Sequence, residues 1–324
     1  MKKDVVFILL YHEHFKRKNS RYFAVIFFLC VIFLYTDLFA ESNQRIAVLY
    51  PESGAKTNQL YNMIIKSMRQ HKGVDIQIRE FSTDNSVASI QQWLQQKDIK
   101  VVVLLGQKGL NLSNKLTIDI PIITGAHLGV STNSSAVSLS ADPVQLFQKL
   151  KKLKPDIKQV DVIYNNANSG WLIKKAKKAA KKNYFKLNAV QVDSVQAAGQ
   201  ALKKIVNDFD ARTDAIWLPY DPILPIKHLL PDLLRKSWQK NLTIFSGNPY
   251  HVQQGTLFAL FPDYSKLGTQ LIDLALYKVN KNNDIHFETS QYLYSAINIR
   301  TASHLGIQLS DDQKNNYKII FPKK

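Results

Sequence analysis

Residues 100–106 have the sequence KVVVLLG, a near-continuous apolar run that ends at a glycine. Similar runs lie at 45–50 (RIAVLY) and 121–124 (PIIT), and apolar residues at helical spacing separate them. Short apolar runs of this kind, bounded by Gly or Pro and separated by helices, are typical of parallel strands buried on both faces. The first half of the chain therefore predicts an α/β unit with a parallel sheet.

The same pattern starts again at residues 160–164 (VDVIY). Further apolar runs follow at 187–192 (LNAVQV), 215–218 (AIWL) and 242–245 (LTIF), again with helical periodicity between them. Two successive series of strands and helices predict two Rossmann-like lobes, each with its own parallel sheet.

A leader-like segment precedes both series. Lys16, Arg17, Lys18 and Arg21 are followed by about fourteen mostly apolar residues at 22–35. A bilayer span needs about twenty residues, so this run is short for a transmembrane helix and matches the order of a secretory signal peptide. We expect residues 1–40 to be a signal peptide cleaved after Ala40, which predicts a periplasmic protein. An uncleaved N-terminal anchor is the alternative, and would keep the protein on the membrane.

Cysteine and charge set further limits. The only cysteine, Cys30, lies in the leader, so the exported part depends on its core rather than on disulfides. The formal net charge is +18, and about +15 remains without residues 1–40. Lysines gather at 149–154 and 174–186, which predicts either weak association with an anionic membrane surface or a solvated helix face. No aromatic-basic motif accompanies them, so nucleic acid is not an expected partner.

In open α/β sheets, ligands bind beyond the carboxyl ends of the strands. The loops at these positions are rich in Gly, Asn and Ser and poor in paired charges, which suits hydrogen bonding to a small polar molecule. Helix capping, turn capping and simple exposure are the alternatives for the Asn, Asp and Tyr residues there. The candidate ligand-binding residues are Tyr50, Glu52, Ser53, Gly106, Gln107, Ala126, His127, Tyr164, Asn165, Asn168, Tyr220, Asp221 and Asn248.

Motifs for catalysis or cofactor binding are missing from the predicted exported part. It contains no phosphate-binding loop, dinucleotide fingerprint, zinc-protease helix or nucleophile elbow. No residues have the spacing of a nucleophile, a base and an orienting acid. We therefore predict a protein that is not an enzyme, with no cofactor and no metal.

The last third of the chain resembles a known family. GTLFALFPDY at 255–264, followed by Leu267-Gly268, resembles the G-A-L-x-x-x-x-x-D-Y-x-x-L-G stretch of ABC-transporter substrate-binding proteins. This family has the type I periplasmic binding fold and includes tryptophan- and tyrosine-binding members. INIRTA at 297–302 and VIYN at 162–165 resemble two further segments of the family.

The resemblance implies two lobes joined by a three-segment hinge, with crossings near residues 157, 258 and 286. The first lobe would comprise residues 41–157 plus 258–285, and the second 158–257 plus 286–324, with Asp263 near the hinge. It also implies a monomer that passes a small ligand to an inner-membrane ABC permease; the alternative is a ligand sensor or envelope-interaction protein that uses no permease. The first-lobe loops at 106–109 and 125–129 depart from the family, so the resemblance implies no particular ligand.

Overall fold

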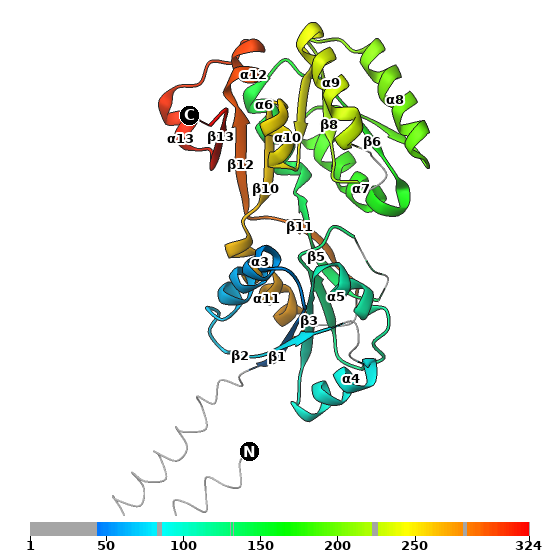
Figure 1. Cartoon of the computed structure of the whole chain (residues 1–324), viewed down its shortest axis with the longest axis vertical. Coiled ribbons are helices and arrows are strands. Elements are labelled where there is room, and N and C mark those ends of the chain that lie inside the picture. The colour runs from blue at the N-terminus through cyan, green and yellow to red at the C-terminus, as the bar shows by residue number, and fades with distance from the viewer. Residues whose placement is uncertain are drawn as a thin grey trace, which may run out of the picture. The chain divides into compact units, whose positions relative to one another are not determined.

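The computed structural model describes residues 44–82, 86–129, 131, 133–221, 226–280 and 284–323 (Figure 1). The predicted signal peptide at residues 1–40 lies outside the described residues. In the part of the chain that is described, no helix is both long and apolar enough to cross a membrane. Residues 44–324 form one compact unit.

The first lobe is built on a sheet with the strand order β11-β5-β4-β3-β1-β2, and all of its pairings are parallel. Its strands are β1 (Gln44–Pro51), β2 (Val74–Phe81), β3 (Val101–Leu105), β4 (Ile122–Gly125), β5 (Ser135–Ala141) and β11 (Phe287–Ser290). Its helices are α3 (Ala55–Met68), α4 (Val87–Gln96), α5 (Gly106–Ser113) and α11 (Tyr264–Asn280).

Alternation along the central strands explains how helices cover both faces of this sheet. Ile46 and Val48 belong to the apolar cluster that includes α3 and α11, whereas Ala47 and Leu49 belong to the cluster that includes α4 and α5. Successive strand residues point to opposite faces, and all four side chains are fully buried. A strand covered on both faces must be apolar at every position, which is why the run at 100–106 predicted it.

The second lobe is built on a sheet with the strand order β13-β12-β10-β9-β8-β6-β7, parallel except where β10 meets β12. Its strands are β6 (Gln159–Tyr164), β7 (Lys186–Gln191), β8 (Asp214–Leu218), β9 (Thr243–Ser246), β10 (Phe258–Pro262), β12 (Leu293–Asn298) and β13 (Ile319–Phe321). Its helices are α6 (Pro143–Leu153), α7 (Asn166–Lys182), α8 (Val195–Asp208), α9 (Ile226–Lys240), α10 (Pro249–Gln254), α12 (Ile299–His304) and α13 (Asp311–Asn315).

An aromatic group centred on Phe147 fixes α6 to the second sheet. The Phe147 ring meets those of Phe185, Trp217 and Phe245 nearly edge-on, at centroid distances of 5.8, 5.8 and 6.4 Å. Such edge-to-face pairs add to the free energy gained by burial. The helix at 143–153 therefore belongs to the second lobe.

The chain passes between the sheets after β5, after β10 and after β11. The crossings thus follow residues 141, 262 and 290, whereas the resemblance implied positions near residues 157, 258 and 286. Strand pairing and helix packing explain the difference. Leu146, Phe147 and Leu150 of α6 lie in the second core, β10 pairs with β9, and β11 pairs with β5. Residues 143–157 and 258–262 thus lie with the second sheet, and 287–290 with the first.

Hydrogen bonds join the three crossings to one another. The Asp142 carboxylate accepts from the Val144 backbone N–H at 2.8 Å, from Thr289 Oγ1 at 2.7 Å and from Gln291 Nε2 at 3.2 Å. The Asp263 backbone N–H, at the start of α11, donates to the Tyr292 carbonyl at 2.9 Å. Asp142 and Asp263 therefore connect the first and second crossings to the third.

Replacing Asp142 with Ala should lower the free energy of unfolding by about 1–2 kcal/mol, because it removes the N-cap of α6 and leaves the hydroxyl of Thr289 without its acceptor. Asp142→Asn keeps a capping oxygen and should lose less. Urea denaturation of both variants measures the difference. Equal stability of the Ala variant and the wild type would show that this carboxylate does not hold the crossing.

Candidate functional site

The strand orders locate where each sheet would bind a ligand. In the first sheet the chain goes from β1 outward to β2 and then returns to β3, so the order reverses between β1 and β3. The corresponding reversal in the second sheet lies between β6 and β8. Ligands of α/β sheets bind beyond the carboxyl ends of the strands at such reversals. A ligand would therefore lie beside the loops after β3, β4, β6 and β8.

A cavity of about 650 Å³ is lined by loops and helix starts from both lobes, and its volume lies in the range of small-molecule sites. Its polar side chains are Gln107, His127, Ser140, Asn168, Ser169 and Tyr220. Its large apolar side chains are Leu110, Leu128, Leu139, Trp171 and Leu172. The wall thus combines an apolar surface with a small number of hydrogen-bonding groups, as small-ligand sites generally do.

His127 is the most deeply buried polar group in this wall, with 3% of its surface exposed. Neither ring nitrogen has a partner in hydrogen-bonding geometry among the described residues. Burial lowers the pKa of His127 to about 4, with the Gly129 backbone acting in the opposite direction. The imidazole is therefore neutral at pH 7, and apart from the influence of the Gly129 backbone its ring nitrogens are not engaged by the described residues.

The cavity carries no formal charge at neutral pH although the whole chain is strongly basic. Among the described residues that line it, none is Asp, Glu, Lys or Arg, and His127 is neutral. Lys108, next to the lining residue Gln107, is exposed and does not line the cavity. A ligand held here would be recognised by hydrogen bonds, dipoles and apolar contact rather than by an ion pair.

Helix α5 begins beside the cavity without a side-chain cap. Gly106 starts it with a φ of +76°, and a Cβ at this position would overlap the hydroxyl of Tyr61. Glycine adopts this left-handed conformation without strain, and a larger residue would also displace the Tyr61 hydroxyl. The first N–H groups of α5 receive no side-chain acceptor, and a helix N-terminus favours a negative or hydrogen-bond-accepting group.

On the second lobe, Asp221 fixes the start of α7. Its buried carboxylate accepts from the Asn165 backbone N–H at 2.8 Å and from Asn168 Nδ2 at 3.1 Å. Asn165 caps α7 by accepting from the N–H groups of Ala167 and Asn168. Asp221 and Asn165 therefore fix the start of α7 without lining the cavity, whereas Asn168 lines it.

Five of the predicted ligand-binding residues meet at this cavity: Gln107, Ala126, His127, Asn168 and Tyr220. They come from the ends of β3, β4, β6 and β8, as the strand-end rule predicted. Tyr220 is 54% exposed and Asn168 is half-buried, so both are accessible to a ligand.

Three predicted residues at or just after the end of β1 do not line the cavity. The ring of Tyr50 packs 5.8 Å from that of Tyr61, and Ser53 Oγ donates to Asn58 Oδ1 at 2.6 Å. Glu52 is exposed. These contacts give Tyr50 and Ser53 structural roles in the turn from β1 to α3.

Five further predicted residues also lie off the cavity lining: Gly106, Tyr164, Asn165, Asp221 and Asn248. Tyr164 is 9% exposed and belongs to the second core. Asn248 caps α10 through the Tyr250 backbone N–H at 2.9 Å. Capping, one of the alternatives that the sequence left open, thus accounts for Asn165 and Asn248.

Sequence reasoning missed the apolar half of the wall, most notably Trp171. This residue lies three positions after Asn168 on α7, and residues at that spacing share one helix face. It is half-buried, packs against the second core and also lines the cavity. The spacing from Asn168 was the available signal.

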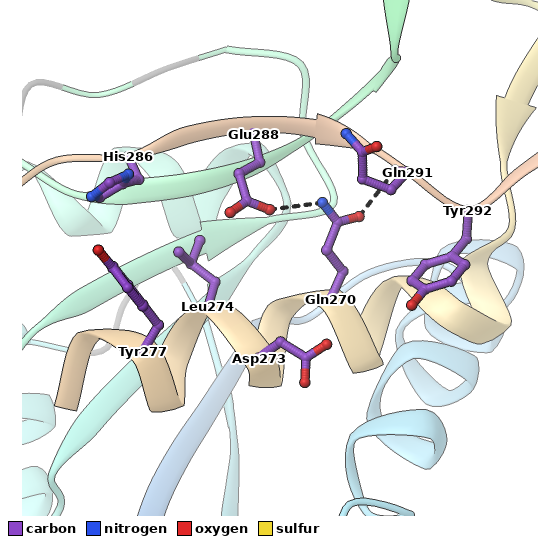
Figure 2. A pocket seen from close by; sticks show the side chains of 8 residues that line it. All are labelled: Gln270, Asp273, Leu274, Tyr277, His286, Glu288, Gln291 and Tyr292. Atoms are coloured by element: carbon purple, nitrogen blue, oxygen red, sulfur yellow. Dashed lines mark hydrogen bonds between the residues drawn. The ribbon is translucent and has the colours of Figure 1, made fainter. Parts of the chain in front are cut away.

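A second cavity, of about 390 Å³, lies between α11 and β11 (Figure 2). Figure 2 shows Gln270 rising from α11 between Glu288 and Gln291, donating to Glu288 Oε2 at 2.8 Å and accepting from the Gln291 N–H at 3.1 Å. These polar groups satisfy one another and tie the third crossing to α11. We therefore assign this region to the hinge rather than to the ligand. No group of three or more potential metal ligands occurs among the described residues.

Two α/β lobes with mostly parallel sheets, three crossings and a cavity at the strand ends define a type I periplasmic binding fold. The family model for ABC transporter substrate binding proteins matches residues 45–315, and the chain belongs to this family. The fold class predicted from the two series of strands and helices is thereby confirmed. The family that residues 255–268 resemble is confirmed as well.

Solved structures agree with this fold. A ligand-free, open substrate-binding protein with adhesive properties from Clostridium difficile is 18% identical, with 86% of this chain and 100% of that chain covered and a TM-score of 0.58. A protein from Streptococcus pneumonia in complex with L-Trp is 21% identical, with coverages of 85% and 100% and a TM-score of 0.50. A search of curated protein sequences finds no match.

Proposed function

We propose that this chain is an exported solute-binding protein that holds one small polar ligand in the 650 Å³ cavity for an inner-membrane ABC permease. The observation that carries the proposal is the uncharged cavity built from strand ends of both lobes. Membership of the substrate-binding family supports it. The three crossings would act as the hinge on which the lobes close over the ligand.

The proposed ligand has a flat apolar part and at least one hydrogen-bonding or carboxylate group. Trp171 and the leucines suit the apolar part, while His127, Gln107 and the uncapped start of α5 suit the polar group. L-Trp, bound by the Streptococcus relative, has both features and belongs in a test panel with other amino acids, nucleosides and sugars.

We further propose that the protein binds without catalysis. Burial lowers the pKa of His127, the cavity's one imidazole, to about 4, so the ring is only a weak base. Among the described lining residues, none is a carboxylate or a lysine that could act as a base or nucleophile. Incubation of the panel with pure protein should leave every compound unchanged. Turnover of any of them would replace this proposal with an enzymatic one.

Replacing Trp171 with Ala should weaken binding of the ligand found with the panel about tenfold or more, because it removes a large aromatic surface from the wall. Isothermal titration calorimetry measures the change. The matched control is Trp238→Ala: Trp238 is 49% exposed, stacks on His304 and does not line the cavity. Equal affinity for both variants would place the ligand elsewhere.

A permease partner requires a cellular test. Deleting the coding sequence should abolish high-affinity uptake of the identified ligand, and the wild-type sequence, but not the Trp171→Ala sequence, should restore it. Binding by the pure protein with unchanged uptake would instead favour the ligand sensor or envelope-interaction protein.

A further inference from the structure

A basic cavity of about 490 Å³ lies within the second lobe and shares no residue with the proposed ligand site. The end of α6 forms one side, with Lys149, Lys152 and Lys154. The segment after α12 and the helix α13 form the other side, which ends at Tyr317. The three lysines thus come together around a concave space.

Positive charge in this cavity is poorly balanced. Asp156 is the acidic residue among its lining, and its side chain is exposed. Among the described residues, no ion pair within 4.0 Å joins Lys149, Lys152 or Lys154 to a carboxylate. Lys154 Nζ instead donates to the Leu305 carbonyl at 3.4 Å.

Lys149 is held in place by an aromatic ring rather than by an acid. Its Nζ lies 3.9 Å from the ring centroid of Tyr317, a cation–π contact. Burial, and secondly the charge of Lys152, lower the pKa of Lys149 to about 8. Burial raises the pKa of Tyr317 to about 12, so the phenol stays neutral and supplies no counter-charge. An anion placed between these lysines would relieve their repulsion.

We propose that this cavity binds a phosphate group, with Lys149 and Lys152 as its principal charge partners. Several ammonium groups around one concave space suit an anion with several acceptor oxygens. The volume is sufficient for more than a single carboxylate. Helix α7 packs against α6 and carries exposed lysines, which would attract an anionic membrane surface. The phosphate can therefore belong either to a soluble ion or to the headgroup of an anionic lipid.

The test compares two variants with the same loss of charge. Lys149→Gln with Lys152→Gln removes the proposed partners, whereas Lys174→Gln with Lys178→Gln removes two exposed charges from α7. Calorimetry with pyrophosphate at fixed ionic strength should show binding by the wild type, about tenfold weaker binding by the cavity variant and less than twofold weaker binding by the α7 variant. Thermal melting verifies that each variant is folded.

Co-sedimentation with phosphatidylglycerol vesicles distinguishes the two sources of phosphate. Two results together identify a lipid headgroup. The cavity variant, but not the α7 variant, loses vesicle binding, and added pyrophosphate displaces the wild type from the vesicles. If the wild type binds pyrophosphate, but the cavity variant and the wild type bind vesicles equally, the ligand is a soluble phosphate. Equal losses for the two variants, or no binding of the wild type to either probe, would overturn the proposal.

Discussion

Lowering the pH from 7.5 to 4.5 should reduce the free energy of unfolding of the ligand-free wild type by about 2–3 kcal/mol more than that of a His127→Leu variant. The unfolded chain protonates this imidazole near pH 6.5, whereas burial lowers the pKa in the folded protein to about 4. The part of the free energy of unfolding that depends on a neutral His127 is therefore fully present above pH 6.5 and is lost as the pH falls toward 4. Urea denaturation at both pH values measures it.

Other groups titrate in both proteins, so the difference between them isolates His127. At pH 7.5 the Leu variant should be at least as stable as the wild type, because it removes a buried polar ring that has no hydrogen-bond partner among the described residues. His228→Leu is the control, since that side chain is exposed and the buried ring of His127 remains. Parallel pH dependences of the wild type and His127→Leu would show that the imidazole is hydrated.

Replacing Gly268 with Ala should destabilise the protein by about 3 kcal/mol, which is at the upper end of typical overpacking costs. Gly268 lies where α11 crosses α3, and a Cβ there would overlap both the Ile64 carbonyl oxygen and Ser67 Oγ. The carbonyl is backbone in a helix, so it can move aside only if the two helices separate. Thermal and urea denaturation should both detect the loss.

Gly199→Ala provides a matched control for that substitution. Gly199 also lies inside a helix, α8, but a Cβ there meets nothing within 4 Å. Ala has the higher helix propensity, so this variant should gain up to about 1 kcal/mol. If both variants changed stability in the same direction, the close approach of α3 and α11 would not be the reason that residue 268 is glycine.

The strands were predictable because burial on both faces demands apolar residues at each position, as in β1 and β3. β5 gave little signal, since its sequence SAVSLSA is small and polar, and its burial arises from pairing with β4 and β11. The sheet that α6 covers was not predictable for a related reason. The apolar face of α6 predicts burial, but it does not specify which sheet the helix covers.

The candidate site could be predicted in part. The strand-end rule found His127, Asn168 and Tyr220, because backbone topology alone brings those loops together. It could not separate Asn168, which lines the cavity, from Asp221, whose carboxylate holds the loop from behind. Trp171 was missed because an aromatic residue of a cavity wall and one of the core have the same sequence pattern.

Native mass spectrometry of the protein incubated with the metabolite panel tests most directly whether the cavity between the lobes holds a ligand. We expect one small molecule per chain, retained by the wild type and by Trp238→Ala and strongly reduced in Trp171→Ala. A folded wild type that retains no compound from the panel, or a complex that Trp171→Ala leaves unchanged, would contradict the account.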